Sequence, residues 1–318
     1  VAAVIITYNS AGAVISCMEA LSKMAPGVKA IVIDNGSTDE TVEQVRAWTK
    51  TRTDVRLIAN AKNQGFAAAA NQGVREAGDS GFILLLNPDA CLLTGIDVLV
   101  AATQQHGLAA GKLVDRHGRA QAGFTVRRLP TPASSIFETL GINRLWPRNP
   151  VNRKYRELDR DLNQAGAAEQ PAGAFLMFRK DVWRKLGGFD EQFYPVWFED
   201  VDFCRRALDA GYRIRYEPAA VASHEGGHSV GRIPAECRAL YWCVSLLKYA
   251  AKHFRPWAFR GICAAVVLGS VPRMVAGMIS ERSLSPLVGY FRIMRFAGVC
   301  LLLPGHITRE YVKKGITG

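Results

Sequence analysis

Four clusters of polar side chains each follow a short apolar run, and their residue types suit the recognition of a nucleotide. The clusters are Thr7-Tyr8-Asn9, Asp34-Asn35-Gly36, Asn60 to Asn63 and Asn87-Pro88-Asp89. Carboxylates and amides can bind bases, ribose hydroxyls and phosphates. Asn, Asp and Gly are also ordinary turn residues, so each cluster alone can equally be interpreted as a turn. Their shared position after an apolar run favours a common site.

Two later clusters carry groups that act in proton transfer or cation binding. The acids Glu199, Asp200 and Asp202 lie close together, and His224 begins a His-Glu-Gly-Gly-His sequence that ends at His228. Carboxylates serve as general bases, and imidazole and carboxylate both bind divalent cations. The simpler interpretations are an acid-rich helix start favoured by the helix dipole and an ordinary loop histidine. The paired glycines argue against the helical H-E-x-x-H site of a metalloprotease.

Strands and helices alternate along the part of the chain that holds these clusters. Apolar runs predict buried strands, separated by helical stretches, at residues 1–8, 29–34, 55–59 and 82–87. This alternation predicts an α/β fold with a mostly parallel sheet, in which ligands bind beyond the carboxyl ends of the strands. Other expected features are a helix from residue 40 with Ser37 or Thr38 as its candidate cap, and a helix at 199–210 followed by a strand at 213–216 and a loop that carries His224. Residues 127–163 are expected to form a long ordered excursion or a partly mobile loop that covers the site, and regular structure is expected to resume at 173–178.

Several protein classes are disfavoured by motif and composition. No G-x-G-x-x-G follows the first strand and no G-x-x-x-x-G-K-[ST] occurs, which argues against a dinucleotide fold and a P-loop. A nucleotidyltransferase should carry a basic glycine-rich loop near its start, and none is present. The seven cysteines are odd in number and never spaced as C-x-x-C, a pattern typical of reduced thiols.

The formal charge of +12 is concentrated in the last quarter of the chain. Residues 238–318 contain 12 Lys/Arg and 2 Asp/Glu, whereas residues 1–237 are nearly neutral. This distribution does not suggest a nucleic-acid-binding face, and it fits a body attached to an anionic surface. Helices are expected at 242–254, 262–279 and 284–303, the last two apolar but interrupted by arginines. We expect them to lie in a membrane interface; the alternative is a buried helical cap on the rest of the protein.

Five segments resemble, in this order, family 2 glycosyltransferases. They are Val4 to Asn9, Val32 to Asp39, Asn63 to Phe66, Leu86 to Asp89 and Phe198 to Asp202. The resemblance covers about residues 1–230 and implies a GT-A fold. It implies a catalytic domain at 1–235, with a nucleotide-binding half at about 1–110 and an acceptor half at about 111–235, followed by a tail at 236–318. Trp146 to Pro150 and Tyr241 to Phe254 resemble, within the family, bacterial rhamnosyltransferases of cell-envelope polysaccharide assembly.

The resemblance also implies roles for individual residues. Asp200 corresponds to the base that deprotonates an acceptor hydroxyl in an inverting transfer, with Glu199 as a supporting acid. Trp197 and Asp202 are expected on the acceptor side. Asp89 corresponds to the last Asp of the family's D-x-D motif and His224 to a further metal ligand; together they would hold Mg²⁺ or Mn²⁺. The first D-x-D position is Asn87, which binds cations less well. The residues expected to bind the sugar nucleotide are Thr7, Tyr8, Asn9, Asp34, Asn35, Asn63, Gly65, Phe66, Asn87 and Asp89.

The expected reaction is inverting transfer of rhamnose from a dTDP-linked donor to a lipid-linked or polysaccharide acceptor. A UDP-linked donor and other sugars, namely galactofuranose, glucose or an N-acetylhexosamine, remain alternatives on the same fold. A non-catalytic membrane-bound sugar-nucleotide-binding module is the alternative that Asn87 favours. Without an export signal in the sequence, the expected location is the cytoplasmic face of the bacterial inner membrane, as a peripheral protein.

Overall fold

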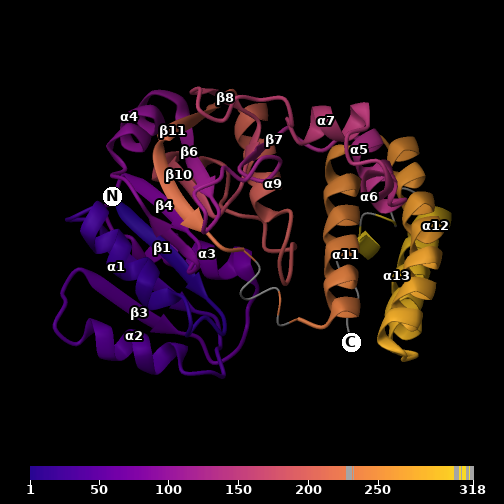
Figure 1. The fold of residues 1–318 in the computed structure, drawn as a ribbon, viewed down its shortest axis with the longest axis horizontal. Coiled ribbons are helices and arrows are strands. Elements are labelled where there is room, and N and C mark those ends of the chain that lie inside the picture. The colour runs from indigo at the N-terminus through magenta and orange to yellow at the C-terminus, as the bar shows by residue number, and fades with distance from the viewer. Residues whose placement is uncertain (227–230, 232, 304–307, 309, 313–314, 316–318) are drawn as a thin grey trace. The chain divides into compact units, whose positions relative to one another are not determined.

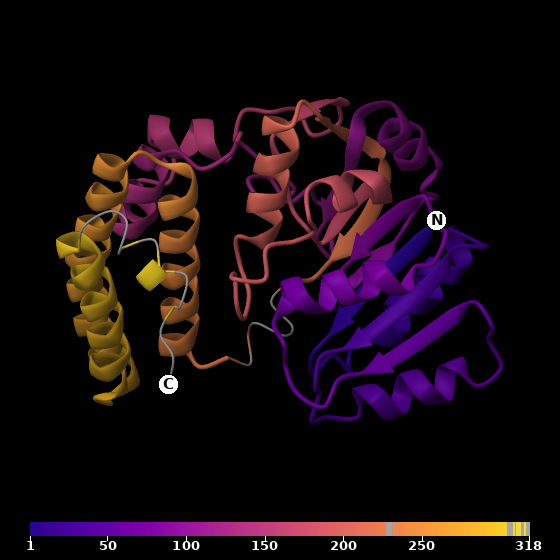
Figure 2. The ribbon, with the colours of Figure 1, turned by 180° about the vertical axis from the view of Figure 1, so that it is seen from behind.

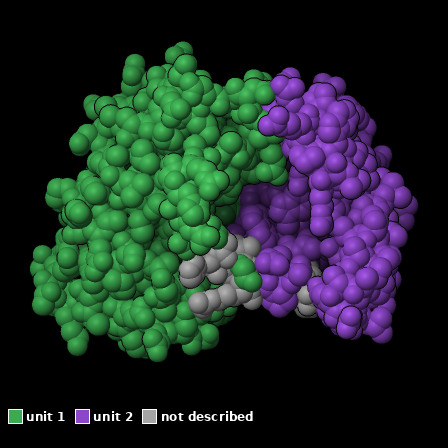
Figure 3. All heavy atoms as spheres, viewed as in Figure 1, with its two compact units in different colours: residues 1–129, 156–191, 199–231 green, residues 130–155, 192–198, 232–318 purple. Residues whose placement is uncertain are grey.

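The computed structural model describes residues 1–226, 231, 233–303, 308, 310–312 and 315 (Figure 1). They divide into two compact units (Figure 3). Unit 1 comprises residues 1–129, 156–191 and 199–231, and unit 2 comprises residues 130–155, 192–198 and 232–318. The Phe198-to-Asp202 motif therefore begins in unit 2, and all three of its acids belong to unit 1.

Unit 1 is built on a large mixed sheet. Its strands are β1 (Ala2–Thr7), β2 (Lys29–Asp34), β3 (Val55–Ala59), β4 (Phe82–Leu86), β5 (Ala90–Leu92), β6 (Gly107–Val114), β8 (Gly166–Ala168), β10 (Phe175–Arg179) and β11 (Arg213–His224). Their order is β3-β2-β1-β4-β10-β6-β11-β5, with β8 paired to β11. Two short strands, β7 (Val126–Arg127) and β9 (Gln170–Pro171), form a second sheet among the described residues.

The first four strands pair in parallel, which confirms the βαβ pattern. Ile5 lies opposite Val32 on one side and Leu86 on the other. The regular structure expected from residue 173 is present as strand β10, which runs antiparallel between β4 and β6. This insertion carries the sheet beyond the nucleotide-binding half, and the fold is the mostly parallel α/β fold that we predicted.

Helices cover both faces of this sheet (Figure 1, Figure 2). One core joins Ala2, Val4 and Ile6 of β1 to α3 (Phe66–Glu76), α8 (Lys180–Lys185) and α9 (Glu199–Asp209). The other joins Ala3 and Ile5 to α1 (Val14–Met24), α2 (Thr41–Thr49) and α4 (Asp97–His106). Because side chains alternate along a strand, a fully apolar β1 requires this burial on both faces.

Three local expectations differ from the structure. The segment 127–163, expected to be an ordered excursion or a partly mobile loop, contains the helices α5 (Pro132–Thr139), α6 (Ile142–Leu145) and α7 (Pro150–Tyr155). Thr131 and Ser134 form a capping box around Pro132, a helix-start signal that the sequence already carried. Helix α2 begins without a side-chain cap from Ser37 or Thr38. His224 is the last residue of a long strand, and Gly227 and His228 lie outside the described residues.

Unit 2 contains α5, α6 and α7, the segment 192–198 and the tail. The long helices in the described part of the tail are α11 (Ala235–His253), α12 (Pro256–Glu281) and α13 (Ser285–Leu302). Helices α12 and α13 are each long and apolar enough to cross a membrane, judged by length and composition alone. Only 33% of the most apolar stretch of each is buried, whereas a core helix would be buried along most of such a stretch.

Candidate active site

The carboxyl ends of β1 and β2 hold Asp34 in a fixed position. The strand register places Thr7 opposite Asp34, and Thr7 Oγ1 donates a 2.9 Å hydrogen bond to Asp34 Oδ1. The backbone N–H of Ser37 donates to Asp34 Oδ2 at 3.0 Å. Asp34 is only 1% exposed. Its carboxylate is therefore held by the turn that follows β2, and a role for Asp34 in binding the nucleotide stays a prediction.

The side chains of Asn9, Asn35 and Asn63 join the neighbouring loops. Asn9 Oδ1 accepts from the N–H of Thr38 at 2.8 Å. Asn35 Nδ2 donates to Asn63 Oδ1 at 2.9 Å, and Asn63 Oδ1 also accepts from the N–H of Gly65. These loops are consequently connected at the edge of the sheet where a ligand is expected.

Helix α3 begins directly after the loop that carries Asn63. Gly65 precedes the helix with a φ of 85°, a backbone conformation that L side chains rarely adopt, and the helix has no side-chain cap. Phe66 is its first residue and is half-buried, as is Tyr8 on the neighbouring loop. An uncapped helix N-terminus is suited to bind a phosphate.

Asp89 and His224 meet because two strands pair antiparallel. Strand β5 begins one residue after Asp89, and its Ala90 lies opposite His224, the last residue of β11. His224 Nε2 lies 3.5 Å from Asp89 Oδ1, and both side chains are almost fully buried. Burial lowers the pKa of His224 from its ordinary value, and the nearby Asp89 carboxylate partly opposes this effect. The neutral imidazole that results is the form that binds metals.

These two residues fit a divalent cation that also binds a diphosphate. Carboxylate oxygen and imidazole nitrogen are both accepted by Mn²⁺, and a diphosphate can supply further oxygens. No group of three or more His, Cys, Asp or Glu side chains that could hold a metal occurs within the described part of the chain. Asn87 is half-buried at the end of β4 and adds no carboxylate. The described residues thus supply two of the ligands that a divalent cation needs.

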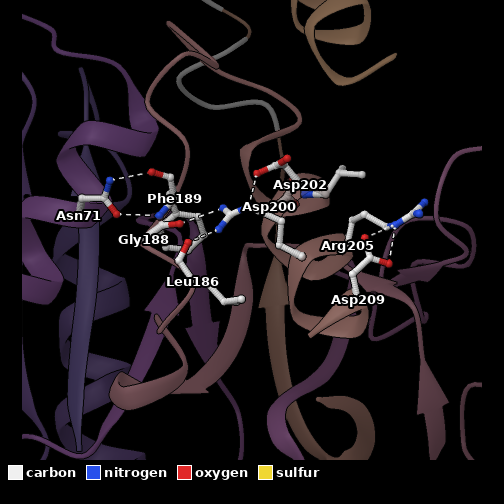
Figure 4. Close-up of polar contacts among 10 residues, drawn as sticks. Asn71, Leu186, Gly188, Phe189, Asp200, Asp202, Arg205 and Asp209 are labelled. Atoms are coloured by element: carbon white, nitrogen blue, oxygen red, sulfur yellow. Dashed lines mark hydrogen bonds and ion pairs between the residues drawn. The ribbon is translucent and has the colours of Figure 1, made fainter. Parts of the chain in front are cut away.

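The three acids at the start of α9 have different environments, and two of them, Asp200 and Asp202, are labelled in Figure 4. Glu199 is buried, and its Oε2 has no hydrogen-bond partner among the described residues. Burial and the neighbouring Asp200 carboxylate raise the pKa of Glu199 well above its ordinary value. Asp202 is fully buried, and its Oδ2 accepts from Arg206 Nε at 2.7 Å. Asp200 alone of the three is partly exposed.

The ion pair between Asp202 and Arg206 anchors α9 to a glycine-rich loop. Arg206 also donates to the carbonyl oxygens of Leu186 and Gly188, each at 2.8 Å (Figure 4). Asn71 of α3 holds the next residue, Phe189, with hydrogen bonds to both its N–H and its carbonyl group. In the structure Asp202 therefore helps to hold the helix that carries Asp200, and its expected position on the acceptor side stays a prediction.

The backbone of Ala172-Gly173-Ala174 contacts both halves of the candidate site. The N–H of Gly173 donates to Asp200 Oδ2 at 3.0 Å. The carbonyl oxygen of Ala174 accepts from the N–H of Asn87, also at 3.0 Å. A Cβ on Gly173 would lie 3.2 Å from Asp200 Oδ2, so a larger residue would press on the carboxylate. No sequence motif pointed to Gly173.

Trp197 belongs to the segment 192–198 of unit 2. It is half-buried and has a φ of 79°, and Phe198 after it also has a positive φ. The ring of Phe198 packs against Trp242 and Tyr249 of α11. A role for Trp197 in acceptor binding stays a prediction.

The sheet order, the antiparallel β10 and a ligand edge built from strand ends define an α/β protein of the GT-A type. The sequence profile of "Glycosyl transferase family 2" matches residues 2–186, and that of "Glycosyl transferase family group 2" matches residues 161–304. The chain belongs to glycosyl transferase family 2.

Two curated relatives are rhamnosyltransferases. The N-acetylglucosaminyl-diphospho-decaprenol L-rhamnosyltransferase of Mycobacterium tuberculosis is 29% identical over 247 residues, which cover 72% of this chain and 77% of the relative. Rhamnosyltransferase WbbL of Escherichia coli is 27% identical over 172 residues, which cover 52% of this chain and 60% of the relative. Both names agree with the resemblance of Trp146 to Pro150 and Tyr241 to Phe254 to bacterial rhamnosyltransferases.

Among solved structures, the mannosyltransferase PcManGT from Pyrobaculum calidifontis, in complex with GDP-Man and Mn²⁺, has a TM-score of 0.54. The two sequences are 18% identical, and the match covers 98% of this chain and 84% of the other. GalNAc-T7 with UDP, GalNAc and Mn²⁺ has a TM-score of 0.53 at 13% identity, over 79% of this chain and 50% of the other. At these identities the likeness establishes the GT-A fold.

Proposed function

We propose that the protein is an inverting glycosyltransferase that moves rhamnose from a dTDP-linked donor to a hydroxyl group of a lipid-linked acceptor. The observation that carries the proposal is the environment of Asp200. Asp200 is the acid of the Phe198-to-Asp202 motif that is partly exposed. Its carboxylate accepts a hydrogen bond from the N–H of Gly173, and the carbonyl oxygen of the next residue, Ala174, accepts one from the N–H of Asn87. The names of the two rhamnosyltransferase relatives support the sugar, and the decaprenol-linked substrate of one supports the acceptor.

In the reaction, the acceptor oxygen attacks the anomeric carbon from the side opposite the diphosphate. The bond from that carbon to the diphosphate oxygen breaks, and Asp200 takes the proton of the acceptor hydroxyl. Asp34, Asn35, Asn63 and the N-terminus of α3 hold the nucleotide and its phosphates. Glu199 and Asp202 do not compete for the proton, because both are buried and Asp202 is paired with Arg206.

Asp89 and His224 would hold a divalent cation, Mg²⁺ or Mn²⁺, against the diphosphate. Such a cation neutralises the charge that develops on the leaving group. The Mn²⁺ named with the mannosyltransferase and with GalNAc-T7 supports this assignment. Since Asn87 supplies no charge, we expect the cation to bind weakly until the nucleotide arrives.

We also propose that the protein is peripheral to the cytoplasmic face of the bacterial inner membrane. Exposed apolar residues of α12 recur at helical spacing, namely Leu268, Val271, Val275 and Ile279. Helix α13 adds Leu287, Val288 and Phe291. Arg273, in the apolar part of α12, binds carbonyl oxygens of Glu138, Thr139 and Gly269 within unit 2, so it needs no partner from the membrane. The basic tail would favour anionic lipids.

The decisive experiment is a screen of the full chain against a sugar-nucleotide panel, with and without Mn²⁺. It should read donor binding and, with a polyprenyl-diphosphate-linked sugar as acceptor, transfer. We expect dTDP-rhamnose to bind and react best. A preference for a UDP-hexose would refute the rhamnosyl assignment, and binding without any turnover would favour the non-catalytic module.

The matched variant is Asp200→Asn. It should reduce kcat by at least about a hundredfold, the usual range for losing a general base, while dTDP-rhamnose still binds. Near-native turnover in this variant would refute the base assignment.

A further inference from the structure

Gln121 contacts His224 through both ends of its amide group. Its Nε2 donates a 2.7 Å hydrogen bond to the backbone carbonyl oxygen of His224, and its Oε1 lies 3.2 Å from His224 Nδ1. The two residues are 103 positions apart in the sequence. One side chain therefore holds both the backbone and the ring of the histidine at the end of β11.

The hydrogen bond to the backbone carbonyl oxygen of His224 fixes the orientation of the Gln121 amide group. A carbonyl oxygen only accepts hydrogen bonds, so the amide nitrogen of Gln121 has to face it. The amide oxygen consequently faces the ring, and it too only accepts. His224 Nδ1 must then carry the proton, which leaves Nε2 with its lone pair.

This tautomer directs two acceptors towards each other at the proposed cation site. The lone pair of His224 Nε2 lies 3.5 Å from the carboxylate oxygen Asp89 Oδ1, and neither atom can donate to the other. A positive ion between them would satisfy both. Nearly complete burial of the two side chains makes such an unpaired arrangement costly without one.

The surroundings of Gln121 keep its side chain in place. Its N–H donates to the carbonyl oxygen of Leu113, and its own carbonyl oxygen accepts from the N–H of Thr125, both at 3.0 Å. The ring of Phe124, in the same turn, stacks on His224 with centroids 5.2 Å apart and planes inclined by 9°. The turn thus restrains the imidazole at its Nδ1 edge and on one face, and leaves the Nε2 edge directed at Asp89.

We propose that Gln121 is a positioning residue for the cation site, which sets the tautomer and the direction of the His224 imidazole. The inference rests on the proposed cation at Asp89 and His224. Without Gln121, the ring is free to protonate at Nε2 and donate to Asp89, a hydrogen bond that would occupy the position of the cation. Partners of this kind commonly change metal affinity by about 10- to 100-fold.

The first test measures the tautomer of the His224 imidazole in the full-length native protein and then in Gln121→Leu. Nitrogen NMR of protein labelled with ¹⁵N-histidine distinguishes the two tautomers, and the signal absent from His224→Gln identifies the residue. We expect Nδ1–H in the native protein and a shift towards Nε2–H in Gln121→Leu. An Nε2–H tautomer in the native protein would overturn the inference.

The second test is Mn²⁺ affinity in the presence of dTDP, read by electron paramagnetic resonance of free Mn²⁺. We expect Gln121→Leu to weaken binding by about 10- to 100-fold, whereas Gln104→Leu, at an exposed glutamine of α4, leaves it unchanged. Unchanged affinity in Gln121→Leu, together with loss in His224→Ala, would overturn the role of Gln121 and keep the cation site. Failure of the native protein to bind Mn²⁺ would instead refute the cation site, and the tautomer measurement would still decide whether Gln121 orients the ring.

Discussion

At the scale of single residues, the start of α9 shows how burial separates acids of similar chemistry. Glu199, Asp200 and Asp202 lie within one helical turn, and their neighbours give each a different state. Glu199 is buried and holds its proton tightly, Asp202 is buried in an ion pair, and Asp200 is partly exposed with its carboxylate bound to a backbone N–H. This difference in exposure is the reason that we propose Asp200 as the base.

The raised pKa of Glu199 predicts that this residue reduces stability at neutral and alkaline pH. Between the ordinary carboxyl pKa and the raised one, the folded state binds more protons than the unfolded state. The free energy of unfolding therefore decreases as the pH rises through that window. Glu199→Gln imitates the protonated acid, so we expect its melting temperature to exceed that of the native protein at pH 8 and to approach it at about pH 4. Melting curves across this range test the prediction, and a difference independent of pH would contradict it.

Gly173 should matter to turnover more than to donor binding. In Gly173→Ala the added Cβ would lie 3.1 Å from the Cβ of Asp200, so the base must move by a few tenths of an ångström. Small displacements of a reacting group are costly, and we expect kcat to fall roughly tenfold with little change in the donor KM. Steady-state kinetics measures both constants. Gly81→Ala, where a Cβ would meet open space, is the control; an equal loss in both variants would argue against the role of Gly173.

At the scale of elements, the contact between α5 and α12 depends on one glycine and one arginine. A Cβ on Gly269 would lie 1.9 Å from the carbonyl oxygen of Thr139, so no larger residue fits between these helices. Arg273, one turn further along α12, donates to the carbonyl oxygens of Glu138 and Thr139 at the end of α5. The arginine that made α12 unlike a simple apolar span thus has a structural role within unit 2.

Gly269→Ala should therefore destabilise unit 2. Overpacking of a close contact costs typically about 1–3 kcal/mol, and we expect a lower melting temperature measured by circular dichroism. Gly261→Ala, in the same helix but at an ordinary 3.7 Å from Ile136, should be neutral or slightly stabilising. If both substitutions had the same effect, the close approach of α12 to α5 would be refuted.

At the scale of the whole molecule, the residues proposed for catalysis and the residues proposed for membrane binding lie in different parts of the chain. The catalytic candidates from Thr7 to His224 belong to unit 1, with Trp197 as the exception. The exposed apolar side chains of α12 and α13 belong to unit 2, as do the basic residues of the tail. This division fits an enzyme whose acceptor is held in a membrane while its donor arrives from solution.

Substitutions of exposed apolar residues in unit 2 should therefore weaken membrane binding without loss of donor binding. In the double variant Ile279→Glu and Phe291→Glu, two exposed apolar side chains become charged. Burial of such side chains contributes roughly 1.5–3 kcal/mol each, so we expect co-sedimentation with phosphatidylglycerol vesicles to fall at least tenfold. Val98→Glu, at an exposed valine of α4 in unit 1, is the control. Unchanged sedimentation of the double variant would contradict the proposed face.

Much of the fold and part of the site followed from local sequence patterns. Apolar runs identified the first four strands because a strand buried on both faces needs no polar positions. Polar clusters after those runs identified the ligand edge because parallel strands end on the same side. The helices of 130–155 were missed although Thr131-Pro132 carries a start signal, since the arginines and prolines around them resembled a loop.

Chain order by itself thus determined the class of fold, the family and the acids at the start of α9, because each of these depends on residues that are close in the sequence. Tertiary structure decided that β10 lies antiparallel between β4 and β6, that Asp89 meets His224, and that Gln121 contacts the ring of His224. It also decided which of the three acids remains accessible. These features depend on strand pairing and burial between segments far apart in the chain, and no local pattern of residue types specifies which distant segments will meet.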